Sequence, residues 1–100
     1  MPRKPEGILQ SACIEYLKSK RIYHVNITPS GWGMKGEPDL ITCINGRFVA
    51  FELKVGNNQM ESDQLVKRDR IVKSGGSHFC PRSFWEFQRI VDEYDEMEGV

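Results

Sequence analysis

Paired cysteines and long apolar runs are both missing from this chain of 100 residues. Cys13, Cys43 and Cys80 are odd in number, widely spaced and in no C-x-x-C pair, which argues against a disulfide framework or a zinc site and predicts reduced thiols in the core. No apolar run approaches the ~20 residues of a membrane helix. The opening residues MPRKPEG lack the apolar stretch of a signal peptide. We therefore expect a cytoplasmic protein with no membrane partner.

The chain also has few histidines and no net charge. His24 and His78 are isolated, each within or beside an expected strand, which favours structural roles over catalysis or metal binding. The net charge of zero hides an asymmetry, because residues 92–100, DEYDEMEGV, hold five of the fourteen acids and no base. The first 91 residues therefore carry fourteen bases against nine acids. A mildly basic body with an acidic tail suits a nucleic-acid partner, although many ordinary proteins share this property.

The length and composition bound the organisation of the chain. One hundred residues form one core but leave no room for a separate cofactor domain. The proportions of hydrophobic (39%) and charged (28%) residues are ordinary for a globular protein. There is no repeat, low-complexity segment or linker. We expect a single domain over residues 1–100, with an acidic C-terminal tail from about residue 92.

Hydrophobic periodicity and turn residues predict seven elements. Ser62 and Ser83 are the expected N-caps of the second and third helices, and Gly75-Gly76 ends the second. The expected elements are helices over 5–20, 62–74 and 83–97, with strands over 21–28, 39–44, 47–54 and 77–81. The order αβββαβα predicts an α/β fold, in which helices flank a small mixed sheet and one of them forms the crossover to the last strand.

The two central strands form the most specific local feature, a hairpin at Asn45-Gly46. Asn-Gly between β-prone runs is a strong hairpin signal, because a type I′ turn needs positive φ at both central residues. A two-residue turn pairs Ile44 with Arg47, and continuing that register places Asp39 opposite Glu52. The alternation of side chains puts Lys54 on the face of Glu52. The opposite face is the expected core, formed by Leu40, Thr42, Val49, Phe51 and Leu53.

Two carboxylates facing each other across strands repel one another unless something lies between them. A divalent cation would remove that repulsion, because hard ions such as Mg²⁺ prefer carboxylate oxygens. The ordinary alternative is a pair of solvated strand ends tied to Lys54. The coincidence of Asp39, Glu52 and Lys54 at one register favours a metal site.

Further candidates lie on the first two helices and in the glycine-rich loop. On a helical wheel Glu6 falls within about 20° of Cys13 and Leu17, on the apolar face, so it is directed toward the same site or only complements the helix dipole. Bases on the second helix suit a phosphate backbone or form a solvated face. A loop tryptophan is equally suited to stacking on a base or to packing on the core. The nucleic-acid-binding candidates are Trp32, Lys35, Lys67, Arg68, Arg70 and Lys73.

The motifs "PDL" at 38–40 and "ELK" at 52–54, separated by a hairpin, resemble the PD-(D/E)XK nuclease signature. The wider pattern is similar to the VRR-NUC branch: "KGEPDL" before the hairpin, "FELK" after it, Gln64 downstream, Gly75-Gly76 before the last strand, and Glu6 followed by Gln10 on the first helix. The resemblance covers residues 6 to about 81. It implies a restriction-endonuclease-like core.

The resemblance also implies roles for single residues. Asp39, Glu52 and the backbone carbonyl of Leu53 would bind Mg²⁺ or Mn²⁺, with Glu6 as a further candidate ligand. Lys54 would position or activate the attacking water. Glu6 and Gln64 would complete the catalytic set. No organic cofactor is expected.

The implied function is metal-dependent cleavage of DNA. Stand-alone VRR-NUC proteins of this size resemble phage-encoded homodimers that cut branched DNA, including four-way (Holliday) junctions, in replication and repair. If this chain is phage-encoded, its cytoplasm is that of the bacterial host. The alternatives are a catalytically weak nucleic-acid-binding subunit with the same fold, and an interaction domain that binds a protein through its last helix and acidic tail. Metal-independent binding of DNA, duplex or branched, without cleavage would favour the first alternative.

Overall fold

The order of helices and strands follows the sequence expectation. The computed structural model describes residues 4–27 and 35–100. Its elements are α1 (Pro5–Ser19), β1 (Tyr23–Asn26), β2 (Leu40–Ile44), β3 (Arg47–Phe51), α2 (Ser62–Lys73), β4 (Ser77–Phe79) and α3 (Phe84–Asp95). The αβββαβα order and the α/β class are thus confirmed.

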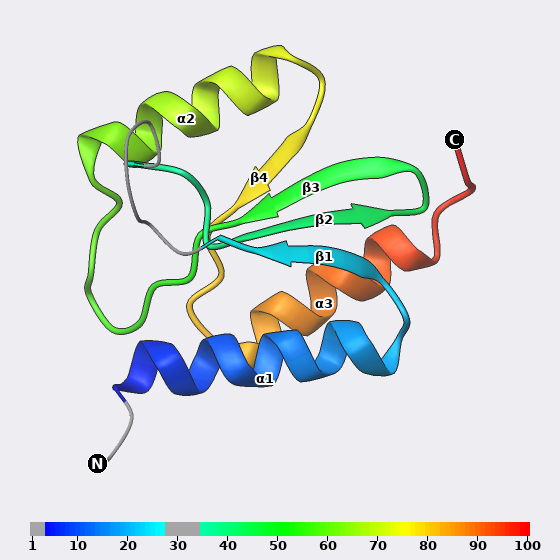
Figure 1. Ribbon diagram of the computed structural model, residues 1–100, viewed down its shortest axis with the longest axis horizontal. Coiled ribbons are helices and arrows are strands. Elements are labelled where there is room, and N and C mark those ends of the chain that lie inside the picture. The colour runs from blue at the N-terminus through cyan, green and yellow to red at the C-terminus, as the bar shows by residue number, and fades with distance from the viewer. Residues whose placement is uncertain (1–3, 28–34) are drawn as a thin grey trace.

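The four strands form one mixed sheet in the order β1-β2-β3-β4 (Figure 1). β1 pairs with β2 and β2 with β3 in antiparallel fashion, whereas β4 is parallel to β3. A parallel neighbour cannot be reached through a tight turn, and α2 makes the crossover. The helix expected behind the last strand is therefore present.

The helices lie on both sides of the sheet. α1 and α3 pack together across one face, and α2 lies beside β4 on the other side (Figure 1). The face toward α1 and α3 is the core, and the five residues expected there are all nearly inaccessible to solvent. They pack with Leu9, Cys13 and Leu17 of α1 and Phe87 and Val91 of α3. None of the helices in the described ranges is long and apolar enough to cross a bilayer.

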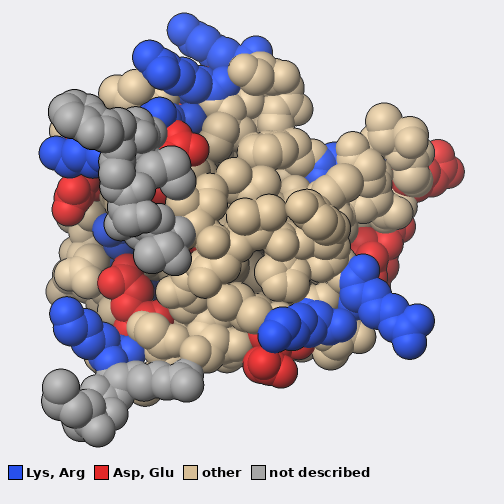
Figure 2. All heavy atoms as spheres, viewed as in Figure 1, with Lys and Arg blue, Asp and Glu red and all other residues tan. Residues whose placement is uncertain are grey.

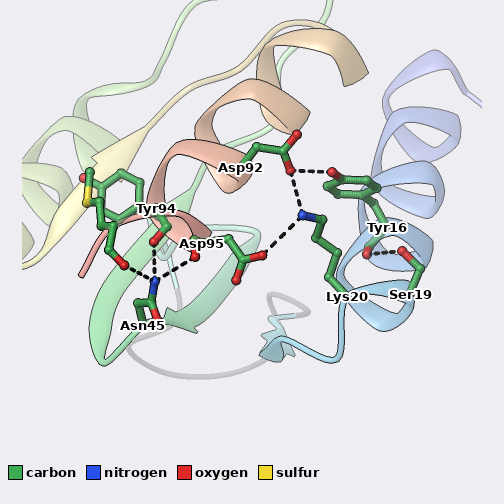
Figure 3. Close-up of polar contacts among 8 residues, drawn as sticks. Tyr16, Ser19, Lys20, Asn45, Asp92, Tyr94 and Asp95 are labelled. Carbon is green, nitrogen blue, oxygen red and sulfur yellow. Dashed lines mark hydrogen bonds and ion pairs between the residues drawn. The ribbon is translucent and has the colours of Figure 1, made fainter. Parts of the chain in front are cut away.

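The hairpin has the turn that its sequence demands. Asn45 and Gly46 have φ values of 53° and 79°, the positive values of a type I′ turn. Pairing runs from Ile44–Arg47 to Leu40–Phe51 as expected. The Asn45 side chain also leaves the hairpin: its Nδ2 lies 2.8 Å from Tyr94 O, 2.9 Å from Asp95 O and 2.8 Å from Met97 O (Figure 3). The turn therefore binds two carbonyls in the last turn of α3, at Tyr94 and Asp95, and one just after the helix, at Met97, where intrahelical donors run out.

The acidic segment is partly neutralised by α1. Residues 92–95 form the last turn of α3, within the helix that the sequence predicts. Lys20 Nζ lies 3.1 Å from Asp92 Oδ1 and 3.2 Å from Asp95 Oδ2, and the Tyr16 hydroxyl donates to Asp92 (Figure 3). The hydrogen bonds to Asp92 and Asp95 raise the pKa of Lys20 above its ordinary value. Two of the five tail acids therefore hold α1 and α3 together.

Several details of the sequence expectation are wrong. β3 ends at Phe51, β4 at Phe79 and α3 at Asp95, before the expected ends at residues 54, 81 and 97. Cys43 is exposed, not in the core, because it lies on the sheet face opposite Thr42. Ser62 is the first residue of α2, and the cap is Glu61, whose N–H donates to Gln64 Oε1 at 2.8 Å. β1 is shorter than the expected strand 21–28, because Arg21 has a positive φ of 56° and ends the connection from α1.

The Asn45 contacts predict a specific loss of stability. Asn45→Asp keeps the size of the side chain and a tolerance for positive φ, but it faces three carbonyl oxygens with a carboxylate. We expect the free energy of unfolding to fall by about 1–3 kcal/mol in urea titrations. Asn57→Asp, at an exposed asparagine, is the matched control. Equal stability of the two variants would contradict a structural role for the Asn45 amide.

Candidate functional site

The open end of the hairpin lies beside the N-terminal ends of α1 and α2 (Figure 1). A hollow of about 350 Å³ occurs there. It is lined by Lys4, Glu6, Gly7, Gln10, Asp39, Glu52, Leu53, Lys54 and Gln64. All five expected catalytic residues, and Leu53, therefore line one hollow although they come from four separate segments. Lys4 and Gly7 were not among the expected site residues. Gln10 lies one helical turn after Glu6, and this spacing predicts that it faces the same hollow.

Glu52 is the most unusual side chain of this hollow. It follows β3 directly, and its N–H donates to Phe79 O of β4 at 2.9 Å, so its backbone is held on the sheet. The side chain is only 2% exposed. Its Oε1 accepts from Gln64 Nε2 at 3.0 Å, whereas no described residue offers a hydrogen bond to Oε2. An unpartnered carboxylate oxygen in the interior is costly, so this atom is expected to have a ligand.

Asp39 is fixed on the other strand by its own backbone and by its side chain. Its carbonyl accepts from Ile27 N–H at 2.9 Å, and its Oδ2 accepts from Leu53 N–H at 2.8 Å. The paired register ends at Leu40–Phe51, so Asp39 and Glu52 are the next residues on each strand. Both side chains line the hollow, as the hairpin register implies.

The surroundings of Glu52 favour its neutral form. Burial, followed by the Asp39 carboxylate, raises the pKa of Glu52 to about 8. Glu6 acts in the same direction more weakly, and Lys54 opposes both. Two ionised carboxylates cannot hydrogen-bond to each other, so the pair needs a shared proton or a cation.

Gln64 connects the Glu52 carboxylate to the start of α2. Its Oε1 accepts from the N–H of the cap residue Glu61 and its Nε2 donates to Glu52. The side-chain amide is thereby oriented at both ends. Because Gln64 donates its hydrogen bond to Oε1 of Glu52, Oε2 remains available to a ligand.

The donor set fits a hard divalent cation. Mg²⁺ and Mn²⁺ prefer oxygen ligands, commonly one or two carboxylates with carbonyls and water completing the shell. Asp39 and Glu52, which both line the hollow, would supply two carboxylates, and Leu53 would add its backbone carbonyl. Within the described ranges no three His, Cys, Asp or Glu side chains come together in a metal-binding arrangement. Glu6 therefore lines the hollow without completing a three-carboxylate group.

The residues expected to bind nucleic acid differ in whether their charges are already paired. Lys35 pairs with Asp63 at 3.2 Å, Lys67 with Glu37 at 2.8 Å, and Arg68 with its neighbour Asp69 at 3.1 Å. Arg70 and Lys73 are exposed on α2, and Figure 2 shows basic side chains along this edge of the molecule. Trp32 lies outside the described residues. The basic surface therefore exists, but three of its cations already have acidic partners.

The site geometry predicts how Asp39 contributes. Asp39→Asn keeps an oxygen for the Leu53 N–H but removes one of the two carboxylates. We expect the affinity for Mn²⁺, measured by titration calorimetry, to fall by about tenfold or more, with the metal-free protein melting at a higher temperature. Asp69→Asn, at an exposed acid of α2, is the control. Unchanged Mn²⁺ affinity would contradict the assignment of Asp39 as a ligand.

Comparison with known proteins bears on the fold. The sequence matches no family model, and a comparison with curated proteins gives no significant match. Among solved structures, one described as "VRR_NUC domain" is 24% identical, with a TM-score of 0.78 over 92% of this chain and 99% of its own. Another, "VRR_NUC domain protein", is 18% identical, with a TM-score of 0.77 over 99% of this chain and 94% of its own. The chain therefore has the α/β fold of these VRR_NUC domains.

Proposed function

We propose that this chain, which has the VRR_NUC fold, is a divalent-metal-dependent DNA endonuclease of the PD-(D/E)XK type. Residues 1–100 form a single nuclease domain in this proposal. The observation that carries it is the buried Glu52 carboxylate, whose Oε2 has no described partner while Asp39 faces it. Lys54 lies in the same hollow. A merely structural carboxylate has no reason to be buried beside another one.

The reaction is hydrolysis of a phosphodiester bond: water attacks phosphorus and one ester oxygen leaves. Mg²⁺ or Mn²⁺ bound by Asp39, Glu52 and the Leu53 carbonyl would neutralise the phosphate charge and make the water more nucleophilic. Lys54 holds that water and stabilises the charge that develops on the phosphate, because its ammonium is a compact cation on a flexible stem. Gln64 fixes the orientation of Glu52.

Glu6 is a positioning residue in this scheme. It comes from the first turn of α1, where it lines the hollow and helps to raise the pKa of Glu52. Because no three carboxylates come together in a metal-binding arrangement within the described ranges, Glu6 acts on water and metal through the other two carboxylates. Its loss is expected to be less severe than that of Asp39 or Glu52.

The proposed substrate is branched DNA such as a four-way junction, cut by a homodimer. A two-fold dimer presents two equivalent sites, one for each strand. The support for this finer part is the resemblance to stand-alone phage proteins. A role in phage replication or repair, in the host cytoplasm, belongs to the same proposal.

Cleavage assays on three substrates test the function. A labelled four-way junction, a linear duplex and a single strand are each incubated with Mg²⁺, Mn²⁺ or EDTA. Asp39→Asn protein, purified in parallel, controls for contaminating nuclease. We expect metal-dependent cutting of the junction that is lost in the variant.

Each other result has a distinct meaning. Equal cutting of all three substrates would keep the nuclease and remove the preference for branched DNA. Tight binding without cutting in any metal would overturn the nuclease and favour a nucleic-acid-binding subunit with the same fold. Sedimentation velocity of the free protein tests the dimer separately.

A further inference from the structure

A second hollow, of about 540 Å³, lies between α2 and β3. Its lining includes Glu37, Phe48, Lys67, Arg70, Ile71 and Gly76. The contributions of α2, among them Lys67, Arg70 and Ile71, follow the i, i+3, i+4 spacing of one helix face. We call this hollow the α2 groove. None of the residues that line it lines the carboxylate hollow.

The floor of the α2 groove carries an exposed aromatic ring. Phe48 is 44% exposed on the sheet face away from α1 and α3. A Cβ at Gly76 would lie 2.9 Å from Phe48 Cδ1 and 3.0 Å from Ile71 Cγ2. The ring therefore sits closely against the backbone at Gly76, where any side chain would displace it. Phe48 is held in place and yet open to solvent.

Basic side chains border the ring on the helix side. Lys67 is paired with Glu37, whereas no acidic group among the described residues lies within ion-pair distance of Arg70. Figure 2 shows the basic side chains of this edge beside an uncharged middle of the face. An aromatic platform next to an unpaired cation is the pattern of single-stranded nucleic-acid binding, in which bases stack and phosphates meet the cation.

The α2 groove begins beside the carboxylate hollow. Lys67 lies one helical turn after Gln64, and Glu37 precedes Asp39 by two residues. A strand whose phosphate lies at Asp39 and Glu52 can therefore continue along α2 over the ring. Bases within a duplex stack on each other and expose only their edges in the grooves. Only an unpaired base can therefore stack its face on Phe48.

We propose that the α2 groove binds an unpaired nucleotide of the DNA substrate, with the base stacked on Phe48 and the phosphate on Arg70. This deepens the proposed nuclease function and rests on it for the identity of the nucleic acid. The groove thereby gives the enzyme a physical means of preferring DNA with unpaired bases near the cut.

Binding in EDTA tests the groove without any cleavage. The probes are a fluorescein-labelled oligothymidylate of about a dozen nucleotides and a blunt duplex of similar length, followed by anisotropy. We expect Phe48→Ala to weaken oligothymidylate binding by about fivefold or more and to change duplex binding by less than about twofold. Phe48→Leu keeps the apolar bulk against Gly76 but lacks the aromatic face, so it should show the same loss. Equal melting temperatures of the variants exclude unfolding.

Trp85 and Arg89 provide a matched control on another element. Trp85 of α3 is 62% exposed with the Arg89 guanidinium 4.8 Å from its ring centroid. Trp85→Ala should leave oligothymidylate binding unchanged. Arg70→Gln should weaken binding and reduce the salt dependence by about one phosphate contact, whereas Arg89→Gln should do neither.

Cross-linking gives a second readout. An oligothymidylate carrying 5-iodouracil should cross-link to Phe48 on irradiation, as located by mass spectrometry. Unchanged affinity of Phe48→Ala and Phe48→Leu would overturn the proposal. If those variants also shift the sedimentation coefficient, the groove is instead a protein interface. Phe48-dependent binding by a protein that never cuts would overturn the nuclease and leave the groove assignment standing.

Discussion

Lys54→Ala is expected to lower the rate of DNA cleavage by about 100-fold or more and to leave DNA binding within about threefold of the parent. Lys54 lies in the hollow that holds Asp39 and Glu52, and its N–H lies 3.5 Å from Pro81 O. The ammonium therefore acts from a backbone position held beside the segment that follows β4. Its charge is used where negative charge develops in the transition state, so the loss falls on the rate rather than on binding.

Single-turnover cleavage and anisotropy in EDTA measure the two effects separately. Lys18→Ala, at an exposed lysine of α1, controls for a general loss of positive charge. Lys54→Arg keeps the charge but replaces the compact ammonium with a planar guanidinium, so it should recover only part of the rate. Cleavage by Lys54→Ala at the parent rate would remove Lys54 from the mechanism.

The second large effect concerns stability and pH. In the absence of divalent metal, we expect the free energy of unfolding to decrease as the pH rises from about 5 to about 8. The folded protein keeps a proton on Glu52 up to its raised pKa of about 8, whereas the unfolded chain loses it near the ordinary value of about 4.3. Between these values the folded state binds more protons, so stability falls with pH. The loss amounts to a few kcal/mol and is complete above about pH 8.

Glu52→Gln should remove this dependence. The glutamine amide can still accept from Gln64, and it places an N–H where Oε2 faces Asp39. The variant should therefore be more stable than the parent at pH 8 and similar to it at pH 5, as judged by urea unfolding in EDTA. Glu15→Gln, at an exposed acid on α1, is the control. A parallel pH profile in the parent and in Glu52→Gln would show that the carboxylate pair is not strained.

Adding Mn²⁺ should reverse the pH effect in the parent alone. A cation between Asp39 and Glu52 favours both charged forms, so the stabilisation by metal should grow as the pH rises. This contrast separates metal binding at the pair from general salt effects, which would act on Glu52→Gln as well.

The local features of this fold follow from short sequence patterns. Asn45-Gly46 defines the turn, the turn defines the register, and the register places Asp39 next to Glu52. Each step depends on neighbours in the sequence or on strict alternation along a strand, so the sequence alone is enough to predict the hairpin. Ser83 likewise caps α3, accepting from Glu86 N–H at 3.2 Å.

Contacts between distant elements could not be derived in this way. Nothing in the sequence shows that Gln64 donates to Glu52 while it caps α2, or that Phe48 stands against Gly76. The burial of Glu52 also depends on how β4 and α2 meet around it. Such features depend on the relative positions of elements, which short-range patterns do not specify. The position of Glu6 on the helical wheel correctly predicted that it faces the hollow, but not how far it lies from Asp39 and Glu52.

The Asn45-Gly46 turn has a consequence for the chemical ageing of the protein. An asparagine followed by glycine is prone to deamidation, because the unhindered backbone nitrogen of the glycine can attack the side-chain carbonyl. In this fold the Asn45 amide is held by three carbonyls at and just after the end of α3, which opposes the rotation that the attack requires. Conversion to a carboxylate would make the native chain equivalent to its own Asn45→Asp variant. Asn45 should therefore deamidate slowly in the folded protein. In unfolded protein it should deamidate faster, and the product would lack the hydrogen bonds between the hairpin and the end of α3.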